Sequence, residues 1–178
     1  LCNYGWYDTE NELSQFSKRA TLLSGNQILK TDSLFYNRNA AMGKAFRNIS
    51  LNDTSKDVIL RGDYSEFYDK NDSTWLTGNA LMIQLMDNDS LFMHADTFKT
   101  VNDSAGKGRV LYAYHHVKAY KKDLQSACDS LVYSFFDSTM RFYKDPVLWS
   151  DENQLTAKYI TMHITNEKMD SLKLYEDA

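Results

Sequence analysis

Apolar and polar residues alternate in short runs along the chain, and the alternation changes phase at a recurring aspartate. The run "LKTDSLFY" around Asp32 is followed by "LRGDYSEF" around Asp63, "MHADTFKT" around Asp96 and "SACDSLVY" around Asp129. A weaker copy, "LTAKYITM", has Lys158 in the place of the aspartate. The successive spacings are 31, 33, 33 and 29 residues. A repeat of this length predicts one supersecondary unit per period.

Each copy of the repeat predicts a strand that bends at its aspartate. The residue before the aspartate is small or polar, and the residue three before it is large and apolar except at Ser126. This alternation has the period of a strand. After the aspartate, apolar residues fall at the second and fourth positions in most copies, as in Leu131 and Tyr133. The inward face therefore changes parity, which requires a bulge or a sharp bend.

Second strands are expected between these units. Apolar alternation marks five further segments, at residues 45–51, 80–86, 110–120, 140–149 and 169–175. The separators are rich in Asn, Asp, Ser and Gly, which favour turns. The segment 11–23 has some helical character, and we interpret it as a leading strand. About ten strands without a convincing helix predict an all-β fold of antiparallel hairpins coiled into a sandwich or roll.

The repeats also predict an elongated molecule with open ends. Such units bury their apolar faces only by stacking on neighbours, so the sheet has a first and a last unit. The end sequences "LCNYGWYD" and "YEDA" contain neither Lys nor Pro, the residues that protect sheet edges. We therefore expect pairing with other β-repeat chains and head-to-tail oligomers. The 178 residues suit one domain, or one section of a longer assembly.

Composition narrows the range of partners. Aromatic residues make up 13% of the chain, which favours β structure. The net charge is −4 with both signs interspersed, so we expect no nucleic-acid partner. No apolar run approaches the roughly 18 residues of a membrane-spanning helix. We expect free thiols at Cys2 and Cys128, because Cys2 lies at an end that can fray.

Groups that could carry catalysis or bind a metal are few. The neighbours His115 and His116 would point to opposite faces of a strand, and no Cys or carboxylate stands at ligand spacing from them. No Gly-x-Ser-x-Gly elbow for a nucleophile occurs. An acid pair for hydrolysis is the one catalytic alternative left, since the chain has 24 carboxylates. We expect neither an enzyme nor a metal or cofactor site.

The repeats resemble a known family. Their "A-D-S-L-x-Y … G-x-A" pattern, present as "TDSLFYNRNAAMGKAFRNISLND" and "LRGDYSEFYDKNDSTWLTGNALMIQL", is similar to the OstA-like family of periplasmic lipopolysaccharide-transport proteins. The segment "DSTMRFYKDPVLWSDENQLTA", residues 137–157, resembles the OstA-like proteins of Bacteroidetes-type envelopes. The likeness covers about residues 21–174. Lys158 and an indistinct first unit depart from the pattern, so the number of strands stays open.

The resemblance implies a fold, a location and a role. It implies a single β-jellyroll, or β-taco, over residues 1–178, whose two sheets form a V around an apolar groove. It also implies a place in the periplasm or cell envelope. There the groove would hold the lipid A acyl chains of lipopolysaccharide, and similar modules would join edge to edge into a conduit to the outer membrane.

The inward apolar stripe supplies the candidate lipid-binding residues. They come from both strands of the repeats and are Leu29, Leu34, Ile49, Leu51, Leu60, Phe67, Ile83, Leu85, Met93, Phe98, Val117, Leu131, Leu155 and Ile160. The same stripe would also form the dry core of an ordinary sandwich. The pattern alone does not separate a groove from a core.

A second hypothesis keeps the fold and omits the lipid. A structural or adaptor module of the envelope would pair with other β-repeats, or would bind cell-surface glycan through Trp75, Tyr112, Tyr114 and Trp149. A closed, fully packed core without a cavity would favour this alternative.

Overall fold

The computed structural model describes residues 1–87, 89–103, 108–150, 152–166 and 168–176. Within them lie fourteen strands and one 3₁₀ helix, Asp69–Asn71. The strands are β1 (Tyr4–Asp8), β2 (Leu13–Ser24), β3 (Gln27–Asn37), β4 (Met42–Asp53), β5 (Val58–Tyr68), β6 (Ser73–Leu85), β7 (Ser90–Asn102), β8 (Arg109–Lys121), β9 (Leu124–Ser134), β10 (Thr139–Tyr143), β11 (Val147–Ser150), β12 (Asn153–Thr156), β13 (Tyr159–Thr165) and β14 (Lys168–Tyr175). No helix in this part of the chain is long and apolar enough to cross a membrane.

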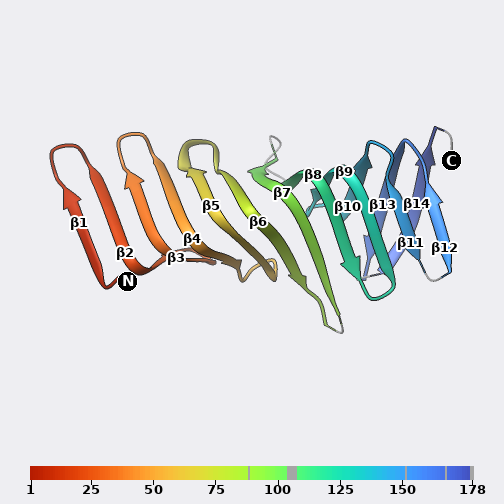
Figure 1. Cartoon of the computed structure of the whole chain (residues 1–178), viewed down its shortest axis with the longest axis horizontal. Coiled ribbons are helices and arrows are strands. Elements are labelled where there is room, and N and C mark those ends of the chain that lie inside the picture. Colours follow the sequence, from red (N-terminus) through yellow and green to blue (C-terminus); the bar gives the residue numbers. More distant parts are fainter. Residues whose placement is uncertain (88, 104–107, 151, 167, 177–178) are drawn as a thin grey trace.

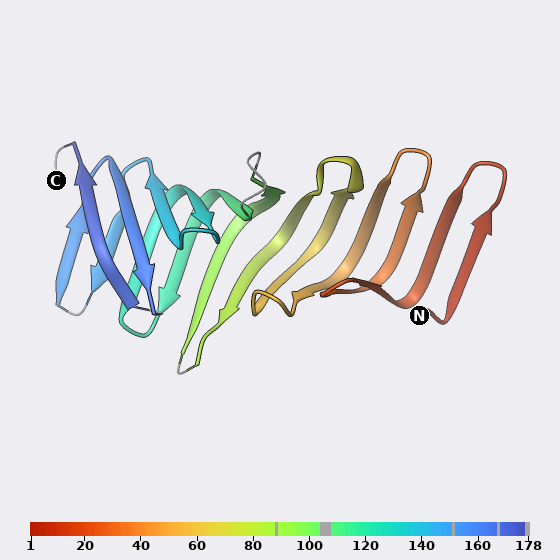
Figure 2. The same cartoon turned by 180° about the vertical axis from the view of Figure 1, so that it is seen from behind.

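The described strands form one antiparallel sheet whose order follows the chain. β1 to β10 pair in succession, β13 and β14 continue from β10, and β11 pairs with β9 and β12. Figures 1 and 2 show the resulting long array, with β1 at one end and β14 at the other. The expectation of an elongated, all-β fold built from antiparallel hairpins is confirmed. The segment predicted as a leading strand is β2.

A bulge with left-handed backbone lies near the middle of each even-numbered strand from β2 to β8. The positive φ angles belong to two adjacent residues in each strand: Lys18 and Arg19, Arg47 and Asn48, Gly78 and Asn79, and His115 and His116. In the β4–β5 register, the pair Phe46–Tyr64 is followed by Ile49–Gly62, so β4 contains one extra residue. The bend predicted at the aspartates is confirmed, but the extra residue belongs to the neighbouring strand.

Side-chain hydrogen bonds join the first two aspartates to these bulges. Asn48 Nδ2 donates to Asp32 Oδ2 at 2.9 Å, and Asn79 Nδ2 donates to Asp63 Oδ2 at 2.7 Å. Asn adopts left-handed backbone more readily than most residues, and its amide supplies the donor that the carboxylate needs. One side chain therefore both tolerates the bulge and fastens it to the next strand.

Histidine and lysine side chains take the place of asparagine at the next two aspartates. His116 Nδ1 lies 2.8 Å from Asp96 Oδ2, and Lys144 Nζ donates to Asp129 Oδ2 at 2.8 Å. His115 Nδ1 lies 3.2 Å from Asp129 Oδ1. The bond from Lys144, with those from the Ser130 side chain and His115, lowers the pKa of Asp129. The two histidines do not alternate as in a regular strand, because their left-handed backbone directs one toward β7 and the other toward β9.

In the last unit, the basic and the acidic side chain have exchanged places. Lys158 stands in the place of the aspartate, and its Nζ lies 3.8 Å from Glu176 Oε2. Glu176 follows the end of β14 and has a φ of 56°. The departure of Lys158 from the repeat is thus matched by a change in its partner.

The bends divide the sheet into two walls that face each other. Wall 1 contains the strand halves that continue laterally from the half of β3 with Leu29. Wall 2 contains the strand halves that continue laterally from the half of β3 with Leu34. At the C-terminal end the division is complete, because β11 pairs with residues 125–127 of β9 while β10 pairs with residues 130–134. β10 and β11 are thus two halves of one bent strand, which explains why the segment predicted at 140–149 is split.

Side chains from both walls fill the space between them in the C-terminal half. The largest almost wholly buried ones all lie in β6 or later: Met82, Met93, Phe98, Leu111, Val117, Leu131, Thr139, Met140, Phe142, Leu148, Ile160 and Met162. Four of these are Met, whose flexible side chain fills irregular gaps. This half of the molecule therefore has a dry core.

Cys2 and Cys128 are free thiols. Cys2 is exposed, and Cys128 lies on the inner face beside the bend of β9. Burial raises the pKa of the Cys128 thiol to about 12. The thiol is therefore protonated at neutral pH and weakly nucleophilic.

We expect the Asn79→Ala variant to be less stable than the wild type by about 1–2 kcal/mol, because alanine loses the bond to Asp63 and tolerates left-handed backbone poorly. Asn79→Gly should lose less, since glycine adopts this φ without a steric cost. Urea denaturation of the three proteins measures both differences. A glycine variant as unstable as the alanine variant would contradict the conformational part of this explanation.

Candidate functional site: the groove between the walls

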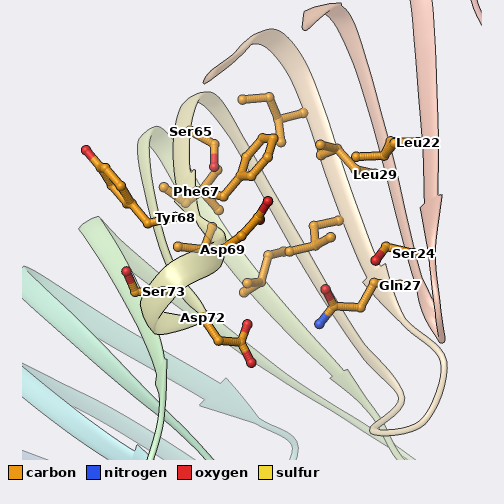
Figure 3. Close-up of a pocket in the computed structure, with 15 residues that line it drawn as sticks. Leu22, Ser24, Gln27, Leu29, Ser65, Phe67, Tyr68, Asp69, Asp72 and Ser73 are labelled. Carbon is orange, nitrogen blue, oxygen red and sulfur yellow. The ribbon is translucent and has the colours of Figure 1, made fainter. Parts of the chain in front are cut away.

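A cavity of about 160 Å³ lies between the walls in the N-terminal half of the molecule. Its apolar lining comes from five neighbouring strands and consists of Leu22, Leu29, Ile49, Leu51, Leu60, Phe67 and Leu76. Its polar lining consists of Ser24, Gln27, Ser65, Tyr68, Asp69, Asp72, Ser73 and Thr74. In Figure 3, Gln27 and Asp72 lie toward the same end of this cavity, away from Phe67. The cavity thus has an apolar body and a polar mouth.

Strand register explains the apolar body on wall 1. Leu29 of β3 lies opposite Leu51 of β4, and Leu51 lies opposite Leu60 of β5. Because side chains alternate between the two faces of a strand, these three leucines form one lateral row on the inner face. They present an apolar surface that continues across the strands.

Phe67 forms the opposite side of the cavity, and its position depends on Gly43. A Cβ atom at Gly43 would lie 1.9 Å from Phe67 Cζ, so only glycine leaves room for the ring. Tyr36 lies on the other side, with its ring centroid 6.2 Å from that of Phe67. The glycine of the repeated pattern therefore fixes the shape of the groove.

The polar mouth is held by hydrogen bonds around the 3₁₀ helix. Tyr36 Oη donates to Asp69 Oδ2 at 2.5 Å, and this bond raises the pKa of Tyr36. Arg109 Nη2 donates to Asp72 Oδ1 at 2.8 Å, and Asn102 Nδ2 donates to Asp72 Oδ2. The charge of Arg109 is thus already matched by a carboxylate.

A second, smaller cavity of about 20 Å³ continues from the first. The two share Gln27, Leu51 and Leu60, and the smaller one reaches Thr100 and Arg109 on wall 2. Its remaining lining residues are Asp53, Lys56, Val58, Leu111 and Phe135. The groove therefore runs from an open chamber toward the filled half of the molecule.

Asp53 lies on the wall 1 side of the smaller cavity. Burial opposes its ionisation, but hydrogen bonds from the Ser55 and Gln27 side chains and the Ser55 amide outweigh it, so the pKa of Asp53 is lowered. The Gln27 bond, from Nε2 to Asp53 Oδ2, is 3.2 Å long. Asp53 therefore carries a negative charge at neutral pH.

A hydrogen bond between the walls marks the boundary with the filled half. Tyr133 Oη, on wall 2, donates to Gln84 Oε1, on wall 1, at 2.9 Å. Tyr133 is 2% exposed, and burial raises the pKa of its phenol. The bond satisfies two polar groups that an apolar interior would otherwise leave unpaired.

The candidate residues named from the sequence fall into three groups. Five of them line the larger cavity: Leu29, Ile49, Leu51, Leu60 and Phe67. Seven lie in or against the apolar core: Leu34, Met93, Phe98, Val117, Leu131, Leu155 and Ile160. Ile83 and Leu85 form the third group, and neither belongs in a groove.

Strand alternation corrects the placement of Ile83 and Leu85. Met82 is fully buried on the inner face, so the odd-numbered residues that follow it point outward. Ile83 is covered on the outer face by its neighbours Ile59 and Phe92, whereas Leu85 is 47% exposed. Both were chosen for their apolar character in a segment that is apolar on both faces.

The sequence interpretation missed several residues that line the groove, chiefly Leu22, Thr74, Leu76, Thr100 and Arg109. Leu76 could have been found, since it lies inward at alternating spacing from Thr74. It was missed because the strand was expected to begin at residue 80, whereas β6 begins at Ser73. The described part of the chain contains no group of three or more His, Cys, Asp or Glu side chains placed to hold a metal ion.

Comparison with known proteins identifies the fold. No family model matches the sequence, and no curated protein matches it either. The crystal structure of LptH from Pseudomonas aeruginosa, the LptA homologous periplasmic component of the lipopolysaccharide transport device, is similar with a TM-score of 0.55. The match covers 64% of this chain and 79% of LptH at 13% sequence identity. At this identity the likeness shows the fold alone, and the expected β-jellyroll is confirmed.

We expect Gly43→Ala to reduce the free energy of unfolding by about 1–3 kcal/mol, because the added methyl group displaces the Phe67 ring. A double-mutant cycle with Phe67→Ala, followed by urea denaturation, measures the coupling. The cost of Gly43→Ala should largely disappear when the ring is absent. An equal cost with and without the ring would show that another contact requires the glycine.

Proposed function

We propose that this chain is a lipid-binding module of lipopolysaccharide transport in the periplasm, with acyl chains held in the open half of the groove. The observation that carries the proposal is the cavity between the two walls, whose apolar part is lined by Leu29, Leu60 and Phe67. A dry sandwich would fill this space, as the C-terminal half does. The fold shared with LptH supports the same role, and no catalytic step forms part of it.

The energetics favour an acyl ligand. Each methylene buried in an apolar site contributes about 0.8 kcal/mol before the cost of ordering is subtracted. A cavity of 160 Å³ is similar in size to apolar cavities of about 150 Å³ that bind benzene, so it accommodates a section of one chain. Ligands with more or longer chains would require the groove to widen toward its filled half.

The finer assignments follow from the repeats and from the edges of the sheet. The OstA-like subtype rests on the resemblance of the motifs, as does the assignment of residues 1–178 to one module. β1 and β14 each hydrogen bond to a strand on one side only within the described residues. These edges suit pairing with similar modules or with a second copy. Sedimentation over a range of concentrations tests self-pairing, and a constant monomer mass would contradict it.

An adaptor module that binds glycan is the second candidate. Its support is an aromatic cluster on the outer face of wall 2, where Trp75 and Tyr114 stack at 6.2 Å and Tyr112 and Tyr114 at 6.3 Å. Lys99 Nζ lies 4.7 Å from the Trp75 ring. Trp149 lies apart from this cluster, on wall 1. Retention on an immobilised glycan that is lost in Trp75→Ala would favour this candidate.

Site-specific photo-crosslinking tests the lipid proposal. We expect p-benzoylphenylalanine at Phe67 to capture added lipopolysaccharide, because this side chain lines the cavity. The matched control is the same replacement at Tyr64, an aromatic residue of β5 on the outer face. Capture at Phe67 alone supports a ligand in the groove. Capture only at Tyr64, or at neither position, would refute it.

A further inference from the structure

A ladder of tyrosines on the outer face of wall 2 ends at the free edge of β14. Tyr143 of β10, Tyr159 of β13 and Tyr175 of β14 lie directly opposite one another in the strand register. Their strand neighbours Phe142 and Ile160 are buried, so the tyrosines point outward. The ring centroids are 5.1 Å apart in the first pair and 4.9 Å apart in the second. Tyr175 is 42% exposed, and within the described residues its ring stacks on one side only.

The lateral row that contains this ladder begins with another tyrosine on the opposite edge strand, β1. The strand register leads from Tyr175 across every strand of wall 2 to Tyr4. The next outward row runs in the same way from Lys173 of β14 to Trp6 of β1. Tyr4 is 62% exposed, and Trp6 is 41% exposed. The same two rows therefore end in exposed side chains at both edges of the sheet.

Side chains of these types already pair across neighbouring strands within the molecule. Lys99 lies directly opposite Trp75 in the β6–β7 register, and its Nζ is 4.7 Å from the centre of the Trp75 ring. A lysine ammonium over a tryptophan face is attracted by the ring quadrupole, and aromatic pairs gain from stacking. The Lys173 side chain has no ion-pair or ring partner among the described residues. A tryptophan opposite Lys173 would repeat the first contact, and a tyrosine beyond the end of the ladder would extend the second.

The directions of the strands permit a second copy to supply both residues. The strands from β1 to β10, followed by β13 and β14, form a path of twelve in which every neighbouring pair is antiparallel. The first and last strands of such a path run in opposite directions, so β1 of a second copy can follow β14 as one more antiparallel strand. The inner face also suits this addition, because Gly5, which has no side chain, would lie opposite Leu174.

We propose that β1 of one copy of this chain adds to β14 of a second copy as an antiparallel strand, with Tyr4 opposite Tyr175. This register also places Trp6 opposite Lys173. The four side chains select the register, because a shift by one residue turns them to the other face and a shift by two separates the pairs. The partner is a second copy, since this chain itself carries both sides of the contact. The inference rests on the edge pairing of the proposed function, and it is independent of the lipid.

Disulfide cross-linking tests the register. Tyr7 would lie opposite Leu172, so Tyr7→Cys combined with Leu172→Cys should link copies into a series of covalent oligomers on a non-reducing gel. β1 and β14 lie at opposite ends of the molecule (Figure 1), so this bond joins separate copies. The matched control combines Tyr7→Cys with Leu174→Cys, a diagonal pair about 7–8 Å apart, which is too far for a disulfide. Cys2→Ser removes the exposed native thiol from both proteins.

Sedimentation of proteins without added cysteines measures the contribution of the selecting side chains. Tyr175→Ala should weaken self-association about tenfold, as expected for one aromatic pair. Lys173→Gln should weaken it about two- to fivefold, as expected for one exposed cation–π contact. Tyr120→Ala, at an exposed tyrosine on the outer face of wall 1, is the control and should change nothing. Thermal unfolding verifies that the three variants fold.

The outcomes separate this register from the lipid proposal. Linking through position 172 and not through position 174, weakened by the Tyr175 and Lys173 variants, supports the inference. Equal linking through both positions, linking through position 174 alone, or no linking at all refutes it. In each of those cases, capture of lipopolysaccharide at Phe67 would still support the groove. If that capture fails while linking through position 172 succeeds, the lipid proposal falls and the register stands.

Discussion

The bulge at the corner of each even-numbered strand from β2 to β8 is the constraint on which the rest of the structure depends. A single antiparallel sheet satisfies its backbone hydrogen bonds but cannot enclose a core, because its two faces point in opposite directions. One extra residue in β4 or β6 turns each strand through the corner and brings the two halves of one face together. Left-handed backbone makes this turn locally unfavourable. The bond from Asn79 to Asp63, with its counterparts at Asp32, Asp96 and Asp129, offsets that cost.

Side-chain size then decides whether the space between the walls is a core or a groove. From β6 onward, Met, Phe and Leu side chains reach across and meet, and Tyr133 closes the gap with Gln84. Before β6, small residues such as Gly43 and Ala45 stand at equivalent inner positions, and a cavity remains. One backbone arrangement thus produces two interiors. The groove and the packed core that the apolar stripe could each form are found in different halves of the molecule.

The bends at the aspartates and the repeat can be predicted from the sequence, because both depend on residues that are close together in the chain. The parity change at Asp32 or Asp129 is visible within eight residues, and turn residues mark the hairpins. Ile83 and Leu85 were misplaced because the segment from Ala80 to Leu85 is apolar at both parities, so only the position of the bulge decides which residues point inward. The cavity depends on how the two walls meet. Contacts such as Tyr133 with Gln84 join residues 49 positions apart, and no local pattern encodes them.

The exchanged pair Lys158 and Glu176 has a consequence for how the chain finds its register. Strands with near-identical repeats can pair one unit out of step at little energetic cost, since each corner accepts the same contact. A slip at the C-terminal end would place Glu176 beside an aspartate such as Asp129, and two like charges would meet where a bonded pair belongs. The exchanged charges of Lys158 and Glu176 therefore disfavour this out-of-step pairing only weakly, because both side chains are largely exposed to solvent.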